Sequence, residues 1–252
     1  MSLHRLPRAT RLITARVEQV FTKKGIYLRR TSYSDVALGA LLRGGCRTSR
    51  AVVSLAQAGY GAATLALARS MIDTWITIRW LTNKDTDSRT RKFLAFDSKQ
   101  RERIIQLIGT YYPNVDLRRY KGNKHHDRQA LEFKKWSAWG PGIKDMAAEA
   151  EVFDASLTGA ASPTWAYDIP FFISSYYLHP TSLGLNHHFQ TPGETFNFVS
   201  RFDEDKMAEQ GLMSTAQCVM LSGLRVAQFW GFDFDDLLIS LWDRYIHPIT
   251  RP

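Results

Sequence analysis

The sequence lacks the features that mark a secreted, disulfide-bonded protein. It has only two cysteines, Cys46 and Cys218, which lie far apart along the chain and match no spacing of metal ligands. The first residues are basic and amphipathic, without the apolar segment that a secretory signal needs. Two isolated thiols suit a reducing compartment, where structural disulfides are rare. These absences predict a cytoplasmic protein with two structural thiols.

Motifs that hold nucleotides, zinc or an acyl-transfer nucleophile are also missing. There is no glycine-rich phosphate loop, no nucleophile elbow, no paired-cysteine zinc motif and no zinc-protease helix. Two pairs of adjacent histidines occur, His125–His126 and His187–His188, but zinc ligands usually come at helical or turn spacing with further ligands nearby. We therefore predict that the protein uses no cofactor and no metal.

An apolar stretch at residues 61–81, GAATLALARSMIDTWITIRWL, organises the rest of the chain. Apolar residues occupy almost every side of the helix that it predicts, so this helix should be largely buried. Arg69 and Asp73 lie four residues apart within it, on one face, and each should pair with the other, with a third group or with a ligand. The stretch is long enough to cross a bilayer, but Arg69, Asp73 and Arg79 would be expensive at mid-membrane, and we predict no span.

The net charge of +9 is divided unevenly along the chain. Residues 1–50 carry a net charge of +9 and residues 84–135 carry +7, whereas residues 136–252 carry −8. A basic first half favours an anionic partner such as RNA, and it also suits docking of basic against acidic faces within a homodimer. A solubilising surface with uneven charge is the alternative.

Hydrophobic spacing predicts helices over most of the chain. They are expected at about 8–24, 35–58, 61–81, 85–112, 127–136, 144–152, 163–179, 203–230 and from 233 onwards. Asp35 and Asp233 are the predicted N-caps of the second and the last of these helices. Pro163 should lie in the first turn of the helix that begins near 163, and Pro170 should interrupt that helix. Residues 195–202 alternate like a short strand and predict a minor β-ribbon. We predict one all-α domain over residues 1–252, a bundle of about seven helices.

The segment SSYYLHPTS, residues 174–182, gathers polar side chains at a predicted helix end. A helix C-terminus favours protonated histidine, so His179 could act there as a general acid or base. The structural alternative is a core histidine that is hydrogen-bonded to a tyrosine or to Asp73. The candidate catalytic residues are Arg69, Asp73 and His179, with Ser175 and Tyr176 in support.

A second polar segment, DLRRYKGNKHHDR at residues 116–128, is strongly basic and contains one aromatic residue. Basic patches with interleaved aromatics contact phosphate backbones. A solvated loop is the alternative. The candidate nucleic-acid-binding residues are Arg118, Arg119, Lys121, Lys124 and Arg128.

Three short motifs carry a resemblance to a known family. They are LARSMID in the apolar helix, KDTDSRTRKFL at the start of the next helix, and YYLHPTSLGL at the end of a tyrosine-rich helix. Together they resemble a family of uncharacterised bacterial all-helical proteins, described only as a domain of unknown function. The resemblance covers about residues 40–190, and the family more often has Glu at the position of Asp73. The matching positions are Arg69, Ser70, Asp73, Asp85, Phe93, Leu94, Ser175, His179 and Pro180.

That family is in turn similar to the HEPN superfamily of helical bundles, many of which are dimeric ribonucleases of defence and toxin systems. This resemblance implies metal-independent cleavage, in which histidine takes the 2′-hydroxyl proton and arginine holds the phosphate. HEPN ribonucleases place that arginine four to six residues before the histidine, but Phe172–Leu178 contains none. Arg119 and His125 match the spacing formally, within the basic loop. If that match is not used, Arg69 of the apolar helix would have to substitute for the arginine that is missing before His179.

Two hypotheses from different classes follow. In the first, the protein is RNA-directed, a divergent HEPN-like ribonuclease or an RNA binder, with Arg69, Asp73 and His179 as its polar centre. In the second, it is a non-catalytic helical module for protein–protein contact, and the same residues form a buried hydrogen-bond network. The absent Arg–His spacing favours the second hypothesis, and the basic half favours the first.

Overall fold

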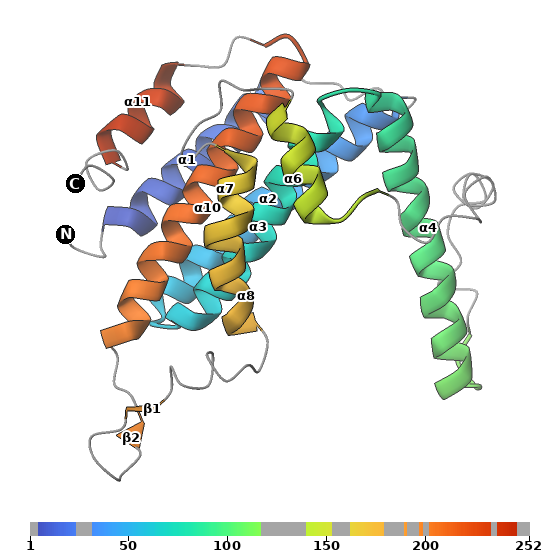
Figure 1. The fold of residues 1–252 in the computed structure, drawn as a ribbon, viewed down its shortest axis with the longest axis horizontal. Helices are drawn as coiled ribbons and strands as arrows, with labels where there is room; N and C mark the ends of the chain where they lie inside the picture. Colours follow the sequence, from blue (N-terminus) through green and yellow to red (C-terminus); the bar gives the residue numbers. More distant parts are fainter. Residues whose placement is uncertain are drawn as a thin grey trace.

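A computed structural model describes residues 5–23, 32–116, 140–152, 162–178, 189–190, 197–198, 202–232 and 236–245. These residues form an α-helical bundle (Figure 1). Its α-helices are α1 (Arg5–Lys23), α2 (Tyr33–Gln57), α3 (Gly61–Leu81), α4 (Thr86–Tyr111), α6 (Ile143–Val152), α7 (Pro163–Ala166), α8 (Phe172–Leu178), α10 (Phe202–Phe229) and α11 (Asp236–Tyr245). A π-turn, η3 (Tyr167–Phe171), joins α7 to α8.

Helix α3 lies at the centre of the bundle, as its apolar composition predicts. It contacts α10 most extensively and also α2, α6 and α8, so neighbours surround it on several sides. Every residue from Trp75 to Leu81 is buried. Its first half leaves one side partly open, where Arg69 and Asp73 are half-buried and Ser70 is exposed. Arg69, Ser70 and Asp73 therefore lie at the edge of the core.

Helices α3 and α10 approach each other closely at two glycines. A Cβ atom built on Gly61 would lie 1.8 Å from the backbone oxygen of Glu204, and one built on Gly211 would lie 2.8 Å from Cγ2 of Thr64. The Glu204 carboxylate also accepts a hydrogen bond of 2.8 Å from the backbone N–H of Ala62. A residue of α10 thus supplies the N-terminal cap that the side chain of Tyr60 does not provide.

Helix α2 begins at a different cap from the one that the sequence predicts. The Ser32 hydroxyl, instead of the Asp35 carboxylate, caps the helix, by accepting a hydrogen bond of 3.2 Å from the Asp35 backbone N–H. The Asp35 carboxylate accepts a hydrogen bond of 3.0 Å from Nε1 of Trp230. The prediction was wrong because a distant indole, invisible in the local sequence, takes up this carboxylate. The adjacent glycines Gly44 and Gly45 do not break α2, and Gly45 packs against Met71 of α3.

The segment from α7 to α8 runs antiparallel to α3. Ser162 caps α7, and Pro163 follows it in the first turn, as predicted. The carboxylate of Glu151, at the end of α6, accepts hydrogen bonds from Ser162 Oγ and from the Thr164 backbone N–H at the start of α7. Helix α6 itself lies against the C-terminal end of α3. Phe171 lies further along, beside Arg69. Pro170, which has no N–H to donate, lies in η3, where the helix widens into a π-turn instead of ending.

Helix α4 extends away from the bundle on one side (Figure 1). It packs mainly on α2 and also touches α3. Asp85, the residue before it, adopts a left-handed backbone conformation with φ of 49° and makes no side-chain cap. The exposed apolar side chains of its outer half and of the turn beyond are Ile104, Leu107, Tyr111, Tyr112 and Val115.

The all-α class and most helix boundaries are confirmed, but the predicted number of helices was too low. Nine α-helices lie within the described residues, because the helix predicted at 163–179 is divided by η3 and because short helices count separately. The predicted cap Asp233 and the predicted helix at 127–136 lie outside the described residues. Part of the ribbon predicted at 195–202 is present, since Asn197–Phe198 (β2) pairs antiparallel with Phe189–Gln190 (β1). Each strand has two residues.

None of the helices within the described ranges has both the length and the apolar character that crossing a bilayer requires.

Replacement of Gly211 by alanine should destabilise the protein, because the added methyl group meets the backbone of α3 at about 3 Å and must push the helices apart. We expect the free energy of unfolding to fall by about 2 kcal/mol. Gly44→Ala is the matched control, since a Cβ at Gly44 meets nothing within 4 Å. That variant should gain roughly 0.5–1 kcal/mol from helix propensity. Urea denaturation measures both, and equal stability of the two variants would contradict the close helix contact.

Candidate functional site

Arg69 and Asp73 do not form an ion pair with each other, although both belong to the described residues. The Arg69 guanidinium stacks on the ring of Phe171, with Cζ 4.5 Å from the ring centroid. Its Nε is buried and has no hydrogen-bond partner among the residues that the structure describes. Of the predicted pairings, neither the mutual ion pair nor an acidic third group is present there. Arg69 instead has an aromatic contact and a buried donor with spare capacity.

Asp73 lies one turn further along α3 and is half-buried. Burial raises the pKa of its carboxyl, and the nearby charge of Arg69 only partly opposes this effect. A carboxyl with a raised pKa can hold and release a proton closer to neutral pH than an exposed one. Arg69 and Asp73 together therefore form a cation beside a carboxyl that could exchange a proton.

Helix α8 extends from Phe171 towards the N-terminal end of α3. Leu178, its last residue, lies seven residues beyond Phe171, or about 10 Å along the helix axis. Asp73 lies on the C-terminal side of Arg69 along α3, whereas α8 runs towards the N-terminal end of α3, because the two helices are antiparallel. The described backbone thus places Arg69 between Asp73 and the end of α8. His179 and the side chain of Tyr176 lie outside the described residues.

The serines near Arg69 are engaged within their own helix. Ser175 Oγ donates a hydrogen bond of 2.7 Å to the carbonyl oxygen of Phe171, and Ser174 donates to that of Pro170. These bonds satisfy carbonyl groups at the irregular π-turn. Ser175 therefore bonds to the backbone that carries Phe171, and its supporting role at a reaction centre stays a prediction. The predicted nucleic-acid-binding residues lie outside the described residues: Arg118, Arg119, Lys121, Lys124 and Arg128.

A cluster around Glu149 of α6 was not predicted. One oxygen of its carboxylate accepts a hydrogen bond of 2.6 Å from Nε1 of Trp80. The other contacts Lys84 Nζ at 2.8 Å and Arg89 Nη2 at 2.5 Å. Arg89 also donates to the carbonyl oxygen of Trp80 and lies 3.9 Å over its ring. We name these four residues the Glu149 cluster; it fastens α6 to the turn between α3 and α4.

Burial opposes the ionisation of Glu149, but the hydrogen bonds from Lys84, Trp80 and Arg89 outweigh that effect. Together with the Arg89 charge they lower the Glu149 pKa to about 2. The carboxylate is thus fully ionised at neutral pH and all its strong partners are in place. A carboxylate held by three donors from its own chain suits a structural role. The spacing of Trp80, Lys84 and Arg89 gave no signal, since their partner lies about 60 residues away.

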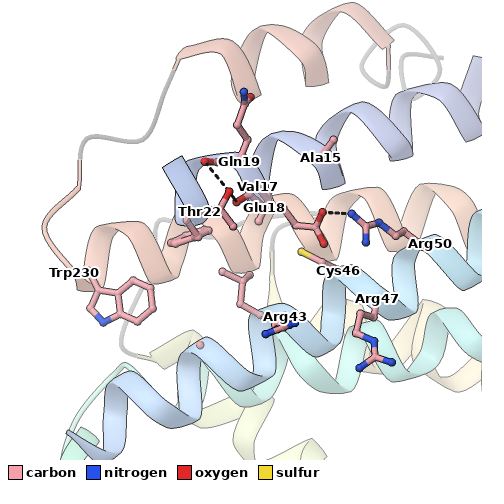
Figure 2. A pocket seen from close by; sticks show the side chains of 13 residues that line it. Ala15, Val17, Glu18, Gln19, Thr22, Arg43, Cys46, Arg47, Arg50 and Trp230 are labelled. Atoms are coloured by element: carbon pink, nitrogen blue, oxygen red, sulfur yellow. Dashed lines mark hydrogen bonds and ion pairs between the residues drawn. The ribbon is translucent and has the colours of Figure 1, made fainter. Parts of the chain in front are cut away.

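An opening with a volume of about 800 Å³ lies between α1 and α2 (Figure 2). We call it the α1–α2 groove. Phe21 and Trp230 line one end of it, and the apolar side chains of Leu42 and Cys46 lie at its base. Glu18 and Arg50 form an ion pair across its other end. Concave sites of this size commonly hold small ligands.

Three arginines of α2 line this groove. Arg43, Arg47 and Arg50 are spaced four and three residues apart, so they form a row along one side of the helix. Arg50 is neutralised by Glu18, whereas Arg43 and Arg47 are exposed and take no ion pair or hydrogen bond from the described residues. This row could have been found in the sequence, from the spacing in LLRGGCRTSR.

Neither cysteine is poised for chemistry. Burial raises the pKa of Cys46 to about 12, with Glu18 adding to the effect and Arg50 opposing it. Burial also raises the pKa of Cys218, and both thiols are free. A neutral thiol is a poor nucleophile and a poor metal ligand. Among the described residues, no group of three or more His, Cys, Asp or Glu side chains is arranged to hold a metal ion.

The Glu149 cluster gives a pH-dependent stability. Because folding lowers the Glu149 pKa from 4.5 to about 2, the ionised group stabilises the fold above pH 4.5, and this contribution is lost as the pH falls towards 2. Glu149→Gln should cost about 1–2 kcal/mol at pH 7, because solvent screens part of the interaction, and it should remove that part of the acid sensitivity. Denaturation across pH, with the exposed Glu102→Gln as control, measures this. An equal loss of unfolding free energy for both variants at pH 7 would contradict the stabilising role of Glu149.

Comparison with known proteins defines a family but no activity. A comparison with curated proteins and one with solved structures each gave no match. A family model described as "Family of unknown function (DUF5677)" matches residues 35–196. The predicted resemblance to an uncharacterised helical family over about 40–190 is confirmed at that level, and no match connects it with the HEPN superfamily. Since the matched region covers more than half of the chain, the protein belongs to DUF5677, a family of unknown function.

Proposed function

We propose that this protein is RNA-directed and that it binds the phosphate backbone of RNA through the arginine row of α2. The observation that carries the proposal is the pair Arg43 and Arg47, which line an open groove without an acidic partner among the described residues. Guanidinium groups bind phosphate by two parallel hydrogen bonds, so two unpaired arginines one turn apart suit successive phosphates. The net charge of +9 over residues 1–50 adds long-range attraction for a polyanion.

The choice of RNA over other polyanions comes from the resemblance to the HEPN superfamily. In this proposal the protein is a divergent HEPN-like member that acts without metal. Arg118, Arg119, Lys121, Lys124 and Arg128 extend the same basic character along the first half of the chain and would add phosphate contacts.

Cleavage of the bound RNA is the stronger form of the proposal. Arg69 would hold the scissile phosphate, and His179 would take the 2′-hydroxyl proton as the 2′-oxygen attacks phosphorus. The bond from phosphorus to the 5′-oxygen would break, and Asp73, on the other side of Arg69, would give a proton to that leaving oxygen. Support comes from the buried Nε of Arg69, which lacks a partner among the described residues, and from the raised pKa of Asp73. The ring of Phe171 orients the guanidinium plane.

A second candidate function, a helical module for protein–protein contact, is favoured by a different observation. Ile104, Leu107 and Tyr111 are exposed on the part of α4 that extends away from the bundle. They lie three and four residues apart and therefore form one apolar stripe. Contiguous exposed apolar surface of this kind is typical of interaction sites. On this alternative Arg69 and Asp73 serve only the packing of α3 against η3 and α8.

Neutralising the arginine row should weaken RNA binding in a salt-dependent way. For Arg43→Gln/Arg47→Gln we expect the slope of log affinity against log salt to lose about 1.4, because each single-strand phosphate contact contributes about 0.7. Fluorescence anisotropy with a labelled single-stranded RNA measures the slope. The control Arg103→Gln/Lys144→Gln removes two exposed charges from α4 and α6 and should leave the slope unchanged. An equal effect of both double variants would indicate general charge attraction and not the row.

The reaction centre is tested by Arg69→Ala and His179→Ala. Both proteins should stay folded, with melting temperatures within a few degrees of the wild type, and should lose RNA cleavage. Gel analysis of a labelled RNA, in the presence of a chelator, gives the cleavage rate. If Arg69→Ala instead unfolds the protein by several kcal/mol, the arginine is structural, as a broken buried contact would be. If the wild type leaves RNA intact, only the binding form of the proposal stands.

A further inference from the structure

We infer that the α1–α2 groove is a subsite for one unstacked nucleotide of single-stranded RNA, with the base at its aromatic end and the phosphate on the arginine row. This inference rests on the proposed function, and it adds which form of RNA is bound and which part of the RNA enters the groove. Figure 2 shows the two ends of the groove, with Trp230 at one end and Arg50 at the other.

The aromatic end is built from Phe21 of α1 and Trp230, which follows α10. Their rings meet edge to face, with centroids 5.7 Å apart, and both are only partly buried. The Trp230 indole is held in place because its Nε1 donates a hydrogen bond of 3.0 Å to the Asp35 carboxylate. Its polar atom is therefore satisfied inside the protein, and what lines the groove is aromatic surface. Such surfaces stack on nucleobases of any sequence.

The phosphate of the ligand would lie at Arg43 and Arg47, away from the aromatic end of the groove. Arg43 and Arg47 lie one helical turn apart, about 6 Å along the axis, and have no partner among the described residues. Arg50 adds no net charge, because Glu18 neutralises it. The cationic part of the groove thus lies between its neutralised end and its aromatic end. A ligand that carries both a phosphate and an aromatic ring is the class that fits both features.

The base of the groove argues for a non-covalent ligand site. The Cys46 side chain is almost fully buried, and burial keeps its thiol neutral. Leu42 lies beside it and is also buried. Near the Arg50 end, the buried hydroxyl groups of Thr14 and Ser49 lie 2.7 Å apart and join the two helices. An apolar base, one aromatic end and a few charged groups at the rim are typical of a pocket that orients its ligand.

The form of RNA follows from this arrangement. Bases within a duplex are stacked on both faces and cannot enter a groove between two helices without leaving the stack. A single strand presents unstacked bases at little cost, whereas a duplex offers only its phosphates to Arg43 and Arg47. The wild type should therefore bind a single strand more tightly than the same strand annealed to its complement.

The test compares single-stranded and duplex RNA in fluorescence anisotropy, with the variants Phe21→Leu and Trp230→Leu. Each variant should bind single-stranded RNA about tenfold more weakly, as lost base stacking predicts, and should bind duplex as the wild type does. The salt slope should stay unchanged, since neither variant alters charge. Trp165→Phe, at an exposed tryptophan of α7, is the matched control and should have no effect.

A competition experiment on the unaltered protein covers the case in which Trp230→Leu or Phe21→Leu fails to fold. Adenosine monophosphate should displace the single-stranded RNA at concentrations where inorganic phosphate of equal ionic strength does not. The subsite is overturned if duplex RNA binds as tightly as single-stranded RNA and if adenosine monophosphate and inorganic phosphate compete equally well. The proposed function still stands in that case, provided that Arg43→Gln/Arg47→Gln weakens RNA binding. If the wild type binds no RNA, both are overturned.

Discussion

The close contact between α3 and α10 is the constraint on which the rest of the bundle depends. At Gly61 and Gly211 the two backbones are too near to admit a side chain, so the register of the two helices is set by backbone contact. Glu204 secures the same crossing by capping the start of α3. With α10 in place on one side, α2, α6 and α8 cover the other sides of α3, and burial of its apolar side chains supplies the favourable free energy.

Two groups of polar side chains border α3 and differ in how fully they are hydrogen-bonded within the protein. Near its C-terminal end, Glu149 has three donors and a lowered pKa, so its hydrogen-bonding capacity is used within the protein. Near its middle, Arg69 has an aromatic neighbour and an unused Nε, and Asp73 has a raised pKa. A well-partnered cluster stabilises a fold, whereas the buried donor of Arg69 and the carboxyl of Asp73 are not used up by contacts with each other.

The uneven charge of the chain has an explanation within one molecule as well as between molecules. Acidic residues of the second half, Glu149 and Glu204, bind to groups of the first half: the cations Lys84 and Arg89, and the N-terminal end of α3. Glu149 and Glu204 therefore make contacts within one molecule, and these contacts do not depend on a homodimer. Arg43 and Arg47 are different, because no acidic side chain of the described residues reaches them, and their charge stays available at the groove.

The sequence by itself determined the helical class, the extent of α3, the proline-containing start of α7 and membership of an uncharacterised family. These follow from periodicity, capping residues and short motifs, which are local in the chain. Only the tertiary structure decided the partners of Asp35, Arg69 and Glu149, and it alone brought Phe21, Arg43 and Trp230 around one groove. The physical reason is that pairing and cavity formation depend on which helix faces meet. That depends on packing between residues as far apart as Asp35 and Trp230, and no local pattern encodes it.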